Sequence, residues 1–234
     1  MVLYQLSMSS SIETIQQTDK PIFVCDIDSV LVDPRKINAL WLPGEPRSTE
    51  LPADESATAE AYNMDLQAFY RAKDRFLQSQ DALDVEPIKD SPDVLGLVAV
   101  FYTVVFASAR VPAVHSHTLA WLEKYYGHEV GELQQDLRLF TIGNDATNFI
   151  DSKESIYAGF GAAAMIDDKK QHHLEAKRAG VGKRIYYQDA NMGGTVRTGS
   201  TPKGSRLAAT FKDVKKILVP KEFEDTVTTT ASQF

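Results

Sequence analysis

Short apolar runs alternate along the chain with stretches in which apolar residues recur every three or four positions. The short runs predict buried strands, and the periodic stretches predict amphipathic helices. The expected strands cover residues 22–25, 104–107, 137–142, 162–166 and 184–187. Strands and helices that alternate in this order are typical of an α/β fold with a mostly parallel sheet.

The helix that starts at residue 91 has the clearest signal. Ser91, Pro92 and Asp93 supply a hydroxyl, a proline at the first helical position and an acid in the first turn. Helical spacing of apolar residues predicts the other helices. The expected helices cover residues 64–77, 91–101, 112–127, 169–180 and 207–218.

Residues 33–90 interrupt the alternation of strands and helices. This stretch holds five of the ten prolines and many acids, and within it 64–77 has an amphipathic pattern. We interpret it as an insertion that folds over the edge of the sheet. The expected organisation is an N-terminal extension (1–20), a core (21–32 and 91–190), a helical cap insertion (33–90), and a C-terminal part with a mobile loop, an amphipathic helix and a frayed tail (191–234).

Composition limits the class of protein. Hydrophobic residues make up 43% and charged residues 24% of the 234 residues, which is ordinary for a soluble globular chain. The single cysteine, Cys25, excludes an intrachain disulfide and fits a reducing compartment. The first twenty residues lack the pattern of a signal peptide, and polar residues interrupt the longest uncharged stretch, 94–109. We therefore expect a cytoplasmic protein with no membrane partner.

Charge is unevenly distributed along the chain, whose net charge is −7. Residues 1–168 contain 12 basic and 26 acidic residues, whereas residues 169–216 contain 12 basic and 3 acidic residues. This basic segment can attract phosphates or a nucleic-acid backbone. We favour a solvated helix face and loop, because acidic proteins seldom bind nucleic acid through their overall field.

Polar side chains follow three of the expected strands. They are Asp26 and Asp28 after the first strand, Ser108 and Arg110 after the second, and Asp167 and Asp168 after a later one. Ligands of an open parallel sheet bind at the carboxyl ends of the strands, so these side chains converge if the strands are neighbours. Carboxylates there can hold Mg²⁺, and the N-terminus of the helix at Pro112 can bind a phosphate. A carboxylate beside a bound phosphate can attack the phosphorus.

The order of the motifs DIDSV, VVFASAR, Lys153 and MIDD resembles that of the haloacid dehalogenase-like phosphohydrolases, over residues 21–188. The resemblance implies a Rossmann-like fold of three layers around a parallel sheet, with a small and mostly helical cap. It also implies hydrolysis of a phosphomonoester with Mg²⁺ as cofactor, through an aspartyl-phosphate intermediate.

Roles for single residues follow from this resemblance. Asp26 is the implied nucleophile, and Asp28 is the implied general acid and base. The implied phosphate-binding residues are Ser108, Ala109, Arg110 and Lys153, and Lys153 also pairs with the nucleophile.

The resemblance also implies the metal ligands. These are the side chains of Asp26 and Asp168 and the backbone carbonyl of Asp28, with Asp167 in a supporting position. Two neighbouring residues depart from the family pattern. Ser29 stands where glycine is common, which puts the local turn in doubt, and Val30 stands where many members have threonine. Neither departure removes a reacting group.

Two branches of the family share further features with the chain. The deoxyribonucleotidase-like branch has a helical cap after the first motif and an ending similar to IDDK at 166–169. The polynucleotide 3′-phosphatase-like branch has a Thr-x-x-Trp-Leu element similar to 118–122. The expected partner is therefore a phosphorylated small molecule such as a nucleotide, or a nucleic-acid end. The alternative is a catalytically silent protein of the same fold whose basic segment, 169–216, contacts nucleic acid.

Several of these residues also have a structural explanation. Lys153 can be a surface lysine, and Arg110 can bind a phosphate or pair with an acid. The aromatic residues Trp41, Phe69 and Tyr70 can stack on a base. Aromatic residues of a cap more often pack its own interior.

Overall fold

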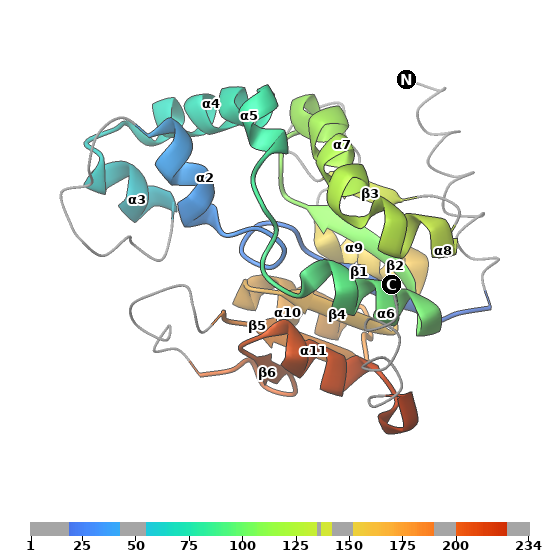
Figure 1. The fold of residues 1–234 in the computed structure, drawn as a ribbon. Coiled ribbons are helices and arrows are strands. Elements are labelled where there is room, and N and C mark those ends of the chain that lie inside the picture. The colour runs from blue at the N-terminus through green and yellow to red at the C-terminus, as the bar shows by residue number, and fades with distance from the viewer. Residues whose placement is uncertain (1–18, 43–54, 135–136, 142–151, 190–199, 224–234) are drawn as a thin grey trace, which may run out of the picture.

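A computed structural model describes residues 19–42, 55–134, 137–141, 152–189 and 200–223 (Figure 1). Its centre is a six-stranded sheet with the order β3-β2-β1-β4-β5-β6, in which all neighbouring strands are parallel. The strands are β1 (Ile22–Cys25), β2 (Thr103–Ser108), β3 (Arg138–Thr141), β4 (Ala164–Asp167), β5 (Lys183–Tyr187) and β6 (Arg206–Ala208). The expected α/β fold with a parallel sheet is confirmed. Expectations for 1–18, 190–199 and 224–234 fall outside the described residues.

The central strands are buried on both faces of the sheet. Every residue of β1, β2 and β4 is buried. Phe23 and Cys25 belong to the hydrophobic cluster on one face, whereas Ile22 and Val24 belong to the cluster on the other. A strand covered on both sides needs apolar residues at every position, which explains the uninterrupted apolar runs in the sequence.

Helices cover both faces of the sheet, so the core has three layers (Figure 1). One face carries α6 (Ser91–Phe101), α7 (His115–Tyr126) and α11 (Phe211–Leu218), and the other carries α9 (Lys153–Phe160) and α10 (Lys170–Arg178). The short elements are η1 (Pro112–Val114), η2 (Gly127–Gly131), α8 (Glu132–Gln134) and η3 (Lys221–Phe223). Within the described ranges, no helix combines the length and the apolar character needed to cross a membrane.

Four helices lie together beyond the sheet, at the upper left of Figure 1. They are α2 (Pro34–Trp41), α3 (Glu55–Ala61), α4 (Leu66–Leu77) and α5 (Gln80–Leu83), and we call them the cap helices. The rings of Trp41 and Phe69 are 5.1 Å apart and pack with Leu42 and Ala59 in a small hydrophobic cluster. Trp41 and Phe69 therefore pack among the cap helices, whereas Tyr70 is exposed.

The last helix is shorter than expected. The prediction of one helix over 207–218 is wrong at its start, because Leu207 lies in β6 and pairs with Tyr186 of β5. The helix α11 begins at Phe211, after a capping box in which the Thr210 hydroxyl and the Asp213 carboxylate each accept from the other residue's backbone N–H. A three-residue strand is too short to show alternation of apolar and polar residues. The spacing between Leu207, Phe211 and Val214 therefore fitted a helix as well.

The helix α6 and the element η2 approach so closely that only glycine fits at position 96. A Cβ atom on Gly96 would lie 2.8 Å from the Cβ atom of Glu129. Overpacking costs about 1–3 kcal/mol, more than the roughly 1 kcal/mol that alanine gains over glycine within a helix. We expect Gly96→Ala to lower the free energy of unfolding by up to about 2 kcal/mol in urea denaturation.

Gly159 in α9 provides the matched control. Among the described residues, no atom beyond its chain neighbours and the backbone of its own helix lies within 4 Å of a Cβ atom built there. Gly159→Ala should leave stability unchanged or raise it by up to about 1 kcal/mol. Equal losses from both substitutions would contradict the explanation by close approach.

Candidate active site

Two central strands carry the site at their carboxyl ends. Asp26 directly follows β1, and its backbone N–H donates to the carbonyl oxygen of Ile166 in β4 at 3.1 Å. Asp167 is the last residue of β4. The parallel pairing of β1 with β4 thus brings together two acids that are far apart in the sequence.

Lys153, the first residue of α9, joins these two acids. Its Nζ atom lies 2.7 Å from Oδ1 of Asp26 and 2.6 Å from Oδ2 of Asp167. Its side chain is 1% exposed, so it is not a surface lysine. Burial lowers the pKa of Lys153, but the charges of Asp167 and Asp26 raise it well above its ordinary value. The ammonium therefore stays charged between two carboxylates.

Further protein groups hold Asp167. Its Oδ2 atom also lies 2.8 Å from Nδ1 of His172, and its Oδ1 atom accepts from the backbone N–H of Lys169 at 2.8 Å. The buried His173 contacts the backbone oxygen of Asp167 through Nε2 at 3.0 Å. Neither histidine matched a motif in the sequence. Their position in the first turn of the helix that follows β4 is the signal that could have found them.

Asp168 completes the group of acids at this strand end. It is buried, and Nζ of the half-exposed Lys169 lies 3.5 Å from its Oδ2 atom. Among the described residues, Asp26, Asp167 and Asp168 form a group whose ligand atoms lie within 4.8 Å of one another. Oxygen donors of this kind fit a hard divalent cation such as Mg²⁺.

Negative charge exceeds positive charge in this buried group. Burial and the charge of Asp167 raise the pKa of Asp26 from 3.8 to about 7, although Lys153 lowers it. Burial also raises the pKa of Asp167, but Lys153 and His172 lower it by more, to well below its ordinary value. The raised pKa of Asp26 shows that Lys153 does not fully balance the negative charge of the carboxylates. A cation bound beside them would supply the missing positive charge.

Asp28 lies outside this group and pairs with Arg110. Nη2 and Nε of Arg110 donate to the two carboxylate oxygens of Asp28 at 2.9 and 3.0 Å, and Nη1 donates to Oγ1 of Thr118 at 3.1 Å. Burial raises the pKa of Asp28, but the charges of Arg110 and Lys73 lower it well below its ordinary value. In this arrangement Arg110 pairs with an acid, and its contact with phosphate stays a prediction.

The end of β2 supplies hydroxyl and backbone groups beside the acids. Ser108 is buried, and its Oγ atom accepts from the backbone N–H of Arg110 at 3.2 Å. Ala109 is exposed between them. Thr141 lies opposite Ser108 in the β2–β3 register, and its hydroxyl is 3.2 Å from Nδ1 of His115. The sequence did not single out Thr141, because only the strand register places it here.

The turn after Asp28 has serine where the family pattern commonly has glycine. Ser29 has a φ of 66°, in the left-handed region that glycine adopts freely and that costs other residues roughly 1–2 kcal/mol. Its N–H donates to the carbonyl oxygen of Val32 at 3.0 Å. Val30, the other departure from the family pattern, is fully buried. The two departures therefore fit the turn.

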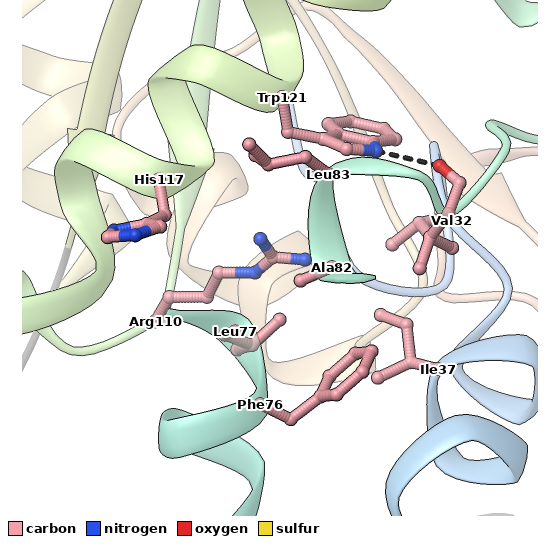
Figure 2. A pocket seen from close by; sticks show the side chains of 10 residues that line it. Val32, Ile37, Phe76, Leu77, Ala82, Leu83, Arg110, His117 and Trp121 are labelled. Atoms are coloured by element: carbon pink, nitrogen blue, oxygen red, sulfur yellow. Dashed lines mark hydrogen bonds between the residues drawn. The ribbon is translucent and has the colours of Figure 1, made fainter. Parts of the chain in front are cut away.

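A cavity of about 10 Å³ separates the cap helices from the core beside Arg110 (Figure 2). Ile37, Phe76 and Leu77 line it from the cap helices, and Trp121 lines it from α7. The Trp121 indole donates to the carbonyl oxygen of Val85 at 2.8 Å, drawn as the dashed line in Figure 2. A space of this size holds about one water molecule.

No protein-family profile matches the sequence, and no curated protein matches it. Solved structures do match. A haloacid dehalogenase-like family hydrolase from Streptococcus pneumoniae has a TM-score of 0.50 and 14% identity, and the match covers 72% of this chain and 85% of that one. A HAD-family hydrolase from Deinococcus radiodurans, solved with bound phosphate and sodium, has a TM-score of 0.52 and 13% identity, with 86% and 98% covered. At these identities the likeness concerns the fold, and the chain has the haloacid dehalogenase-like fold.

Proposed function

We propose that the protein is a Mg²⁺-dependent phosphomonoesterase that works through an aspartyl-phosphate on Asp26. The observation that carries this proposal is the buried contact of Lys153 with both Asp26 and Asp167, beside a third carboxylate, Asp168. Such a group of charges costs stability when it is buried. Binding a cation and a phosphate would offset that cost, and the structural neighbours with this fold are hydrolases.

The proposed reaction has two steps. First, a carboxylate oxygen of Asp26 attacks the phosphorus, the P–O bond to the leaving group breaks, and the leaving oxygen takes up a proton. Lys153, whose ammonium already contacts Asp26, balances the charge on the phosphoryl oxygens together with the hydroxyl of Ser108. In the second step, water attacks the aspartyl-phosphate, releases phosphate and restores the carboxylate of Asp26.

Asp28 is the proposed proton carrier in both steps. Because Arg110 keeps it ionised, Asp28 is ready to take a proton from the water of the second step. To protonate the leaving oxygen in the first step, Asp28 must first carry a proton. Its two bonds with Arg110 must therefore loosen when substrate is bound, while Thr118 retains the guanidinium.

The proposed cofactor is Mg²⁺. The side chains of Asp26 and Asp168 and the backbone carbonyl of Asp28 would hold it. When bound, it neutralises phosphate charge and so reduces the repulsion between the phosphate and the attacking carboxylate. Both oxygens of Asp167 already accept bonds from protein groups, which fits a supporting position for this residue.

The proposed substrate is a phosphate on a nucleotide or on a nucleic-acid end. The support is the helical insertion after the first motif and the Thr-x-x-Trp-Leu element at 118–122. In that element, Thr118 holds Arg110 and Trp121 binds the carbonyl oxygen of Val85. The element therefore acts by holding the site in place, through contacts within the protein.

The proposal is tested by phosphate release from a panel of phosphomonoesters. The panel contains nucleoside 3′- and 5′-monophosphates, 3′-phosphorylated oligonucleotides, sugar phosphates and p-nitrophenyl phosphate, each with Mg²⁺ and with EDTA. We expect turnover of a nucleoside phosphate that falls at least about tenfold in EDTA. A folded protein that releases no phosphate from any member of the panel with Mg²⁺ present would contradict the proposal.

The alternative of a silent, nucleic-acid-binding protein rests on the basic segment 169–216. Most cations of this segment that the structure describes lie in α10, β5, β6 and α11, and α10 and α11 pack on opposite faces of the sheet. Several of them have partners within the protein; Arg178, for example, pairs with Glu154 at 2.6 Å, and Lys183 donates to the Tyr102 hydroxyl at 2.9 Å. This distribution favours solvated faces. Salt-sensitive DNA binding without turnover would favour the alternative.

A further inference from the structure

One lysine of the cap helices occupies a position that helical spacing reserves for apolar side chains. Lys73 lies in α4, four residues after Phe69, three before Phe76 and four before Leu77, which are all buried. Residues at these spacings share one face of a helix. The Lys73 side chain is 17% exposed, whereas lysines usually extend their ammonium group into solvent. The chain thus places an ammonium on the face of α4 that packs inward.

This face of α4 adjoins the proposed active site. Phe76 and Leu77 line the same cavity as Arg110, whose guanidinium holds Asp28 (Figure 2). Burial lowers the pKa of Lys73, but the charges of Asp28 and of Glu55 raise it above its ordinary value. Lys73 therefore interacts with the residue proposed to exchange a proton with the leaving oxygen.

Lys73 also has a partner within the cap helices. Its Nζ atom lies 2.5 Å from Oε1 of Glu55 in α3, and the Glu55 side chain is 42% exposed. Asp28 and Glu55 balance the charges of Arg110 and Lys73 in the resting protein. Because the face of α4 that carries Lys73 adjoins Arg110 and Asp28, an anion on a leaving group bound beside Asp28 can compete with Glu55 for the ammonium.

We propose that Lys73 binds a second phosphate group carried by the leaving group, which makes the substrate class a phosphomonoester with another phosphate on the same molecule. This inference rests on the proposed function and adds the chemistry of the leaving group to it. The second phosphate is either that of a small bisphosphate or the phosphodiester of a nucleic-acid end. Both present the same anion to an ammonium.

A different explanation is that the pair of Lys73 and Glu55 only joins α3 to α4. The two explanations differ in the effect of neutralising Glu55. If the pair only joins helices, Lys73→Met and Glu55→Gln weaken the protein alike. If Lys73 binds substrate, Glu55→Gln keeps the ammonium and removes its competitor, so the affinity for the second phosphate is kept or raised.

The experiment measures binding in an Asp26→Asn background, so that it does not depend on turnover. A nucleoside 3′-monophosphate, the matching 3′,5′-bisphosphate and a 3′-phosphorylated dinucleotide are titrated by calorimetry with Mg²⁺. We expect the bisphosphate to bind about tenfold more tightly than the monophosphate, the effect of one charge-assisted contact. Lys73→Met should reduce this ratio to within about threefold, whereas Glu55→Gln should keep it.

Lys36→Met is the matched control, because Lys36 is another lysine of the cap helices with a 51% exposed side chain. It should keep the ratio of affinities. The inference is overturned if the bisphosphate does not bind, if the ratio is the same with and without Lys73, or if Glu55→Gln removes it as Lys73→Met does. The affinity of the dinucleotide relative to the bisphosphate identifies the source of the anion. Failure of the proposed function is a separate result, in which the wild-type protein releases phosphate from no member of the panel with Mg²⁺ present.

Discussion

Replacing Asp26 by asparagine is expected to reduce phosphomonoester hydrolysis by roughly 10⁴-fold or more. The substitution keeps the shape of the side chain, but it removes the anionic oxygen that attacks the phosphorus. It also removes one of the two carboxylates proposed to hold the cation. The measurement is kcat for the best substrate of the panel with Mg²⁺. Asp93→Asn, at an exposed acid in the first turn of α6, is the matched control and should keep full activity.

Stability shows independently whether the Asp26→Asn protein is folded. The pKa of Asp26 is raised from 3.8 to about 7 in the folded chain, by burial and by the charge of Asp167. Its ionised form therefore costs stability that is absent below about pH 4, grows up to about pH 7 and stays constant above. Asparagine carries no such cost, so the variant in EDTA at about pH 8 should unfold at no lower a urea concentration than wild type. A folded variant with activity within tenfold of wild type would contradict Asp26 as the nucleophile.

The strands that position the site could be predicted because their neighbours make them apolar throughout. β1, β2 and β4 are covered by helices on both faces, so their residues form short apolar runs that stand out in the sequence. The acids that end these runs are equally visible. Since all strands are parallel, their carboxyl ends meet at one edge, and the structure brings Asp26 and Asp167 together there.

The resemblance implied that Lys153 pairs with Asp26, but the other partners of these acids could not be predicted, because they depend on tertiary contacts between side chains. Arg110 and Asp28 are 82 residues apart, and the sequence was equally compatible with a phosphate contact for Arg110. His172 and Thr141 reach the site through a helix turn and a strand register, neither of which has a motif. Lys73 is different, because a charged residue at an apolar position of the amphipathic pattern is visible in the sequence of α4.

Replacing Lys153 by methionine is expected to affect both stability and turnover. The Lys153 side chain is 1% exposed and its ammonium contacts two buried carboxylates, so methionine would leave Asp26 and Asp167 facing each other without a counter-charge. Breaking a buried pair in this way costs about 3–5 kcal/mol. We expect a loss of that size in the free energy of unfolding by urea denaturation at about pH 8 in EDTA. Turnover should fall by roughly 10³-fold, because the charge that balances the phosphoryl oxygens is gone.

The stability loss caused by Lys153→Met should shrink as the pH falls. Without the ammonium that lowers it, the pKa of Asp26 rises above the value of about 7 that it has in the wild-type protein. The cost of ionising Asp26 therefore stops growing at about pH 7 in wild type but continues to grow above pH 7 in the variant, so this part of the loss disappears as the pH falls to about 7. Adding Asp26→Asn to Lys153→Met removes the same repulsion at every pH, so the double variant should be more stable than Lys153→Met alone. Lys169→Met, at a side chain that is 47% exposed and 3.5 Å from Asp168, should change stability by no more than about 0.5 kcal/mol. A stability loss that is absent, or that does not vary with pH, would contradict Lys153 as the shared counter-charge of the two acids.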